Sequence, residues 1–181
     1  GGMRAIDLLI SDEFHRAAPG GSGGVKAIGN YAPGMMPSKL AKAQGYAEII
    51  YLDAKTSTNV EEVGAANFFC IKDSVLYTPE LTGTILPGIT RDSIIALARH
   101  MGYEVVEEKV SAEFAMSADE AFCCGTAAVI SPIGSITHAD TKVTYGDGTP
   151  GTITKTLYDK LTGIQSETED DMFGWLHEVP L

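Results

Sequence analysis

Residues 19–34 read PGGSGGVKAIGNYAPG, and this glycine-rich stretch decides how the rest of the chain is interpreted. It holds six of the twenty glycines, so we predict a loop with unusual backbone angles or a close approach to another group. The letters GGSGG match the GxSxG elbow of hydrolases, but no buried strand leads into them, as that motif requires. A phosphate-binding P-loop is excluded because Val25, not glycine, precedes Lys26.

The segments around this loop alternate between strand and helix patterns, which indicates one mixed domain. Three segments are predicted helices: 35–44, 90–101 with Thr90 as N-cap, and 153–164. Short apolar runs predict the strands, and the third and fourth of these should form a hairpin around a polar turn. The predicted strands are 6–10, 48–52, 67–72, 74–78, 103–110 and 121–136, the last interrupted by Gly125, Pro132 and Gly134.

Composition limits the function classes. The chain has 181 residues, 44% of them hydrophobic, which suits one globular domain with a sizeable core. A formal net charge of −11 disfavours nucleic acids and anionic membranes as partners. The chain does not open with the basic stretch and following apolar stretch that are typical of a signal peptide. It also holds no apolar run of the roughly 20 residues that a membrane span needs. Small molecules are therefore the expected partners.

The cysteines and histidines predict neither a disulfide framework nor a metal site. Three cysteines without CxxC spacing suit a reducing compartment, and we expect buried free thiols. The four histidines are scattered and lack the paired spacing that metals require.

Four segments together resemble one enzyme family. In chain order they are GVKAIGNY (24–31), EEVGAANFF (61–69), ILPGITR (85–91) and FCCGTAAVISPIG (122–134). Each alone is a weak signal, but the ordered set resembles the C-terminal half of the branched-chain amino acid aminotransferases. The resemblance implies an α+β fold of type IV, in which a mixed sheet curls into a pseudo-barrel with packed helices. It also implies pyridoxal 5'-phosphate as the cofactor.

The resemblance assigns three residues to the reactive part of the cofactor. Lys26 would carry pyridoxal phosphate as a Schiff base and then move a proton during catalysis. Glu62 would keep the pyridine nitrogen protonated, so that the ring accepts electrons. Tyr31 would donate a hydrogen bond to the phenolic oxygen.

Further residues would hold the phosphate, the ring and the substrate. Ile89 and Thr90 begin a predicted helix, whose free N–H groups favour a phosphate. By resemblance, Thr126 would bind the same phosphate and Leu86 would pack against the ring. Thr126 and the Ala127 N–H would meet the substrate.

The implied function is transfer of the amino group between leucine, isoleucine or valine and 2-oxoglutarate. Residues 1–181 would be the cofactor-lysine domain of a homodimer, without the family's small N-terminal domain, and inactive by themselves. Two alternatives remain: a D-amino acid aminotransferase or aminodeoxychorismate lyase of the same fold, and an inert binding or regulatory module. The expected location is intracellular, cytoplasmic by default and plastid or mitochondrial in a eukaryotic source.

Overall fold

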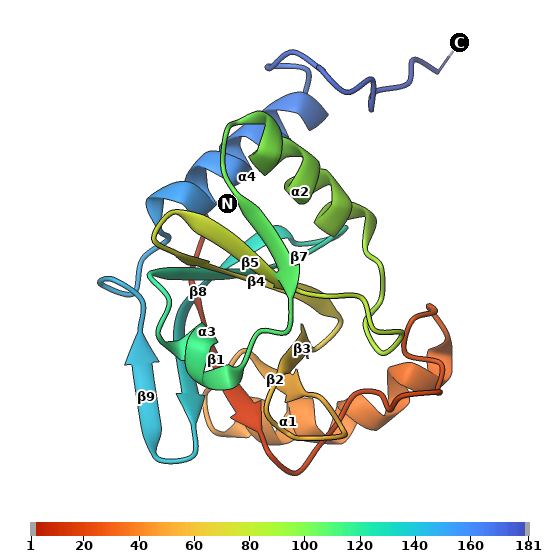
Figure 1. Ribbon diagram of the computed structural model, residues 1–181, viewed down its shortest axis with the longest axis vertical. Helices are drawn as coiled ribbons and strands as arrows, with labels where there is room; N and C mark the ends of the chain where they lie inside the picture. The colour runs from red at the N-terminus through yellow and green to blue at the C-terminus, as the bar shows by residue number, and fades with distance from the viewer. Residues whose placement is uncertain (1–2, 180–181) are drawn as a thin grey trace.

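The computed structural model describes residues 3–179, which form one nine-stranded sheet and four α-helices (Figure 1). The helices are α1 (Met35–Ala43), α2 (Ile89–His100), α3 (Ala112–Met116) and α4 (Thr152–Gln165). The strands are β1 (Ile6–Ser11), β2 (Glu48–Leu52), β3 (Val60–Val63), β4 (Ala66–Lys72), β5 (Val75–Pro79), β6 (Val105–Glu108), β7 (Glu120–Gly125), β8 (Val129–His138) and β9 (Thr141–Thr144).

Six of the strands close into a barrel. Their order is β3-β2-β1-β8-β7-β4, and β3 also pairs with β4, so the last strand meets the first. β5 and β6 extend the sheet beyond β4, and β9 extends it beyond β8. The sheet is mixed, because β1 runs parallel to both of its neighbours while the other barrel pairs are antiparallel. The predicted curled mixed sheet is confirmed.

Three apolar clusters explain where the helices lie. The largest receives side chains from all six barrel strands, and α3 packs against it. A second cluster joins one face of β4 and β7 to α2 and α4, which lie side by side at one end of the molecule (Figure 1). A third joins α1 to β1 and β2 at the opposite end. The outer surface of the barrel therefore carries α1 on one side and α2 on another.

Most predicted elements are found within two residues of their expected bounds. Exceptions have local causes. The predicted strand 121–136 is two strands, β7 and β8, because residues 126–128 turn the chain back and Val129 has a positive φ of 57°. The predicted strand 103–110 is found as Val105–Glu108, two residues shorter at each end and so still within this range. The N-cap assignment of Thr90 is wrong: Gly88 holds that position and Thr90 lies inside α2.

The expected buried thiols are confirmed for all three cysteines, which are free. Within residues 3–179 no helix is both long and apolar enough to cross a membrane. No group of three or more His, Cys, Asp or Glu side chains suited to a metal occurs in this same range.

The first turn of α4 is capped from a distant strand. Glu120 on β7 accepts hydrogen bonds from the backbone N–H groups of Ile153 and Thr154, at 3.0 and 2.9 Å, and from the Thr154 hydroxyl at 2.7 Å. The helix has no cap from its own N-cap residue, Gly151, where an added Cβ would overlap the Glu120 side chain. This long-range cap fastens α4 to the barrel.

Replacing Glu120 by Ala should lower the free energy of unfolding by about 1–2 kcal/mol, because two helix N–H groups lose their acceptor. Urea unfolding measures the change. Glu104→Ala, at an exposed position, serves as the control and should shift the midpoint little. Equal stability of the two variants would contradict the proposed cap.

Candidate active site

Glu62 is a buried carboxylate on the outer surface of the barrel. It is 2% exposed, and its β-sheet partners are Tyr51, which faces α1, and Asn67 on β4. Its Oε1 accepts hydrogen bonds from the Leu86 backbone N–H at 2.9 Å and from Asn67 Nδ2 at 3.2 Å. The carboxylate thus lies where β3, β4 and the segment before α2 meet.

Arg16 supplies the positive charge beside this carboxylate. Its Nε lies 2.5 Å from Glu62 Oε2, and both side chains are 3% exposed. Nε makes no hydrogen bond of good angle, so this contact is an ion pair rather than a directed bond. Its Nη2 donates to the carbonyl oxygens of Gly23 and Thr84, at 2.9 and 2.5 Å. The guanidinium therefore joins the glycine-rich loop to the segment before α2.

Burial controls the ionisation of Glu62. It raises the pKa of Glu62 from 4.5 to about 7, and the charge of Glu61 adds to this effect. Arg16, the Leu86 N–H and the charge of Lys26 act in the opposite direction. A further cation that binds beside Glu62 would favour the ionised form of the Glu62 carboxyl group. Lys26, although distant in sequence, thus lies within electrostatic reach of Glu62.

The loop that carries Lys26 is held from inside by Asn30. The buried Asn30 accepts a hydrogen bond from the Ser22 hydroxyl and donates to the carbonyl oxygens of Ser22 and Val25, each at 2.7 Å. The close approach predicted for the glycines is found at Gly23, where an added Cβ would overlap Thr84. Lys26 itself is exposed, and its Nζ lies 5.8 Å from the centre of the Tyr31 ring.

Tyr31 faces a small cavity of about 210 Å³ on the α1 side of the site. Arg16, Tyr51 and Glu48 also line this cavity. Tyr31 therefore lies near Arg16, the ion-pair partner of Glu62.

The N-terminus of α2 is open. Its N-cap residue, Gly88, provides no side-chain cap, and Ile89, the first helical residue, is 79% exposed. Asn67 donates to the Leu86 carbonyl oxygen at 2.9 Å, and a Cβ on Gly88 would overlap Asn67 Oδ1. Free N–H groups at a helix start attract anions. Asn67 thus fixes the open helix end beside Glu62.

The turn with Thr126 and Ala127 lies at the same end of the barrel. Asn67 pairs with Cys124 across β4 and β7, so this turn begins just beyond Asn67. Both residues are exposed. The structure thus gathers the segments of Glu62, Leu86, Ile89, Thr90 and Thr126 around Asn67.

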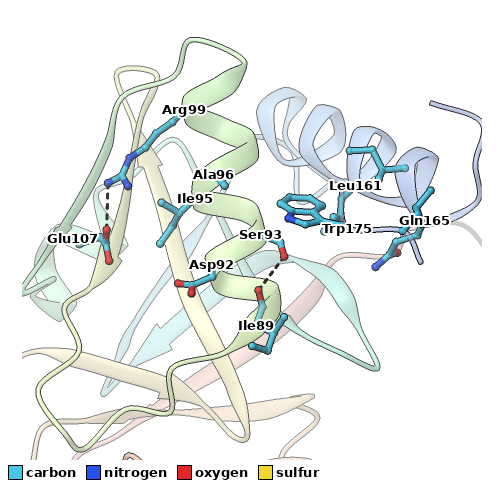
Figure 2. A pocket seen from close by; sticks show the side chains of 12 residues that line it. Ile89, Asp92, Ser93, Ile95, Ala96, Arg99, Glu107, Leu161, Gln165 and Trp175 are labelled. Atoms are coloured by element: carbon cyan, nitrogen blue, oxygen red, sulfur yellow. Dashed lines mark hydrogen bonds and ion pairs between the residues drawn. The ribbon is translucent and has the colours of Figure 1, made fainter. Parts of the chain in front are cut away.

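A larger cavity, about 680 Å³, lies elsewhere, between α2, α4 and the C-terminal segment (Figure 2). Figure 2 shows the Trp175 ring between the two helices, with the Arg99 and Glu107 ion pair on the other side of α2. Of the predicted site residues only Ile89 lines it. It lacks both the buried carboxylate and Lys26, so the chemistry points to the Glu62 region instead.

Two residues of the site, Arg16 and Asn67, were not assigned from the sequence. Asn67 stands in the EEVGAANFF segment as a polar residue ahead of an apolar strand, which is a signal that could have revealed it. Arg16 precedes the glycine-rich loop without any such pattern. Its role depends on a fold that brings residues 16, 62 and 84 together.

Comparison with known proteins places the chain in a family. A family model described as amino-transferase class IV matches residues 4–136. Branched-chain-amino-acid aminotransferase 3, chloroplastic, from Arabidopsis thaliana is 49% identical over 174 residues, which cover 96% of this chain and 42% of the relative.

Two solved structures agree in fold. The branched-chain amino acid aminotransferase of Escherichia coli superposes with a TM-score of 0.88 at 38% identity, covering 97% of this chain and 56% of that one. The branched-chain amino acid aminotransferase of Thermobaculum terrenum, solved in its PLP-form, has a TM-score of 0.83 at 32% identity, covering 92% and 53%. The chain thus spans about half the length of the proteins it matches. On the family model and these relatives together, the chain belongs to the class IV aminotransferases.

Proposed function

We propose that this chain is the cofactor-lysine domain of a branched-chain amino acid transaminase, which exchanges the amino group between leucine, isoleucine or valine and 2-oxoglutarate. The observation that carries the proposal is the buried Glu62, paired with Arg16 and within the electrostatic field of Lys26. The names of the relatives support the substrate class. Pyridoxal 5'-phosphate is the proposed cofactor, as the PLP-form of one structural neighbour suggests.

The residues of the site fit this cofactor. A protonated ring nitrogen needs a buried carboxylate, and Glu62 has one oxygen bonded to two N–H donors and the other against Arg16. A phosphate needs N–H donors, and the open start of α2 at Ile89 and Thr90 offers them. The aldehyde carbon of the cofactor needs an amine as its partner, and the Lys26 amine is exposed on its loop.

Bound pyridoxal phosphate supplies an electron sink for the bond broken at the substrate Cα. Glu62 would hold the proton on the ring nitrogen, and its hydrogen bonds and Arg16 would keep the carboxylate oriented. Lys26 Nζ would act first as the nucleophile and then as the base that moves the Cα proton. Tyr31 would donate to the phenolic oxygen.

The remaining assigned residues would orient the ligands. Ile89 and Thr90 would donate backbone N–H bonds to the phosphate, joined by the Thr126 hydroxyl, and Leu86 would pack against the ring. The Ala127 N–H would meet the substrate carboxylate. Several of these groups are exposed in this chain, so exclusion of water would fall to other parts of the whole protein, including a small N-terminal domain and the second subunit of a homodimer.

In the full-length protein, borohydride reduction with pyridoxal phosphate should fix the label on Lys26, because the charge of that exposed amine acts on the buried Glu62 carboxylate of the proposed site. Peptide mapping by mass spectrometry locates the label. The peptide with Lys39, another exposed lysine, is the internal control and should stay unlabelled. A label on any lysine other than Lys26 would contradict the assignment of Lys26 as the cofactor lysine.

Glu62→Gln should leave the cofactor bound but slow the reaction about a hundredfold, or about 2.7 kcal/mol in barrier, because an amide cannot hold a protonated ring nitrogen. Single-turnover kinetics with leucine measures the proton-transfer step. Glu108→Gln, at an exposed position, is the matched control. Unchanged turnover in Glu62→Gln would remove this residue from the mechanism.

Gly88→Ala should weaken pyridoxal phosphate binding about tenfold or more. The added methyl group would push Asn67 aside and disturb the helix start, costing a charge-assisted hydrogen bond to the phosphate. Fluorescence titration of the cofactor-free protein gives the affinity. Gly29→Ala is the control, since its Cβ would meet no atom within 4 Å. Equal affinity in both variants would argue against phosphate binding at α2.

A further inference from the structure

Arg91 is a cation buried in the first turn of α2. It is the third residue of the helix and is 1% exposed. Its Nη2 donates to the Pro79 carbonyl oxygen at 3.1 Å and to Glu107 Oε2 at 2.9 Å, so the guanidinium joins α2 to β5 and β6. A positive charge is unfavourable at a helix N-terminus, because the helix dipole is positive there. The position is therefore stable only with an anion close by.

Glu107 offsets only part of this charge. Its other oxygen, Oε1, lies 3.2 Å from Arg99 Nη2, so one carboxylate is shared by two guanidinium groups (Figure 2). Partial burial raises the pKa of Glu107, but the hydrogen bonds and charges of Arg91 and Arg99 bring it below its ordinary value, so Glu107 is ionised at neutral pH. Asp92 lies 3.9 Å from Arg91 Nη1, but its side chain is 76% exposed and water screens its charge. The buried charge of Arg91 is therefore only partly neutralised.

The hydrogen-bonding capacity of the Arg91 guanidinium is also incompletely used. Both of its hydrogen bonds come from Nη2, while Nε is buried without a partner. Arginine stays charged in proteins, so loss of a proton cannot relieve this position. A buried cation in such surroundings attracts an anion more strongly than a surface cation does, because little water is present to screen it.

Arg91 lies close to both segments that are proposed to bind the phosphate. Ile89 and Thr90 precede it directly in α2. Burial raises the pKa of the Cys124 thiol and the charge of Arg91 opposes that rise, so the end of β7 is within electrostatic reach of Arg91. Thr126 follows two residues beyond Cys124. A phosphate bound between the start of α2 and Thr126 would therefore lie in the field of Arg91.

We propose that Arg91 is a positioning residue for the cofactor phosphate: its buried charge strengthens the attraction of the α2 start for the phosphate, and Glu107 limits that attraction. Arg91 does not touch the phosphate, because a side chain that is 1% exposed cannot reach a bound ligand. The backbone N–H groups of Ile89 and Thr90 make the contact instead. This inference rests on the proposed function, since it takes the phosphate of pyridoxal phosphate as the anion.

The test compares pyridoxal phosphate with pyridoxal, which lacks the phosphate, in the full-length, cofactor-free protein. Fluorescence titration gives both dissociation constants, and their ratio isolates the contribution of the phosphate. Arg91→Met, which removes the charge, should weaken pyridoxal phosphate binding about tenfold and change pyridoxal binding less than about twofold. Arg91→Lys should recover part of the loss, because the charge returns. Equal losses for the two ligands in Arg91→Met would overturn the proposal.

Glu107→Gln separates the charge of Arg91 from its role as a link between α2 and β6. The amide oxygen can still accept the Arg91 hydrogen bond but carries no charge, so pyridoxal phosphate should bind about threefold more tightly and pyridoxal as before. Weaker or unchanged binding of pyridoxal phosphate would overturn the proposal, because a residue that acted only as a link would give that result. The Glu107 side chain is 36% exposed, so this variant should fold even if Arg91→Met does not.

Arg99→Met is the matched control. It removes the same kind of charge from the same helix and the same carboxylate, but the Arg99 side chain is 52% exposed, so the affinity ratio should change less than about twofold. An equal change in Arg99→Met and Arg91→Met would overturn the assignment to Arg91. Failure of the unaltered protein to bind pyridoxal phosphate would refute the proposed function and the inference together. Normal binding there, with an unchanged ratio in Arg91→Met, would refute the inference alone.

Discussion

The ion pair between Arg16 and Glu62 joins parts of the chain that would otherwise be separate. Glu62 receives N–H groups from Leu86 and Asn67, while Arg16 binds carbonyl oxygens of Gly23 and Thr84. A buried ion pair is costly unless its remaining polar atoms are satisfied. These bonds meet most of that need, and in doing so they fix the glycine-rich loop, β3, β4 and the start of α2 in one arrangement.

The barrel gives this pair its location. β3 bonds to both β2 and β4, so the ring closes at the strand that carries Glu62. The interior is apolar and belongs to the core, and the site lies on the outer surface between α1 and α2. A rigid closed sheet thus supports polar groups on its outside, and the loops around it supply the reactive ones. This division suits a scaffold on which the loops determine the chemistry.

Sequence patterns predicted the elements whose residues show a clear period. The helix at 89–100 has apolar residues at helical spacing, and the hairpin at 66–79 has β-forming residues around a polar turn. β3 was not predicted as a strand, because VEEV buries two glutamates where a half-buried strand would show alternation. The resemblance pointed to the barrel and to Glu62, but Arg16 could not be found, since a contact between residues so far apart in the chain leaves no periodic trace.

The open start of α2 limits what can change at position 88. A helix is usually stabilised by Ser, Thr, Asp or Asn at the N-cap, but any side chain on Gly88 would overlap Asn67. Glycine is also the residue that leaves the first N–H groups of the helix accessible to a ligand. Neither natural sequence change nor laboratory selection for heat resistance can therefore introduce a capping side chain at this position. Added stability has to come from substitutions elsewhere in the molecule.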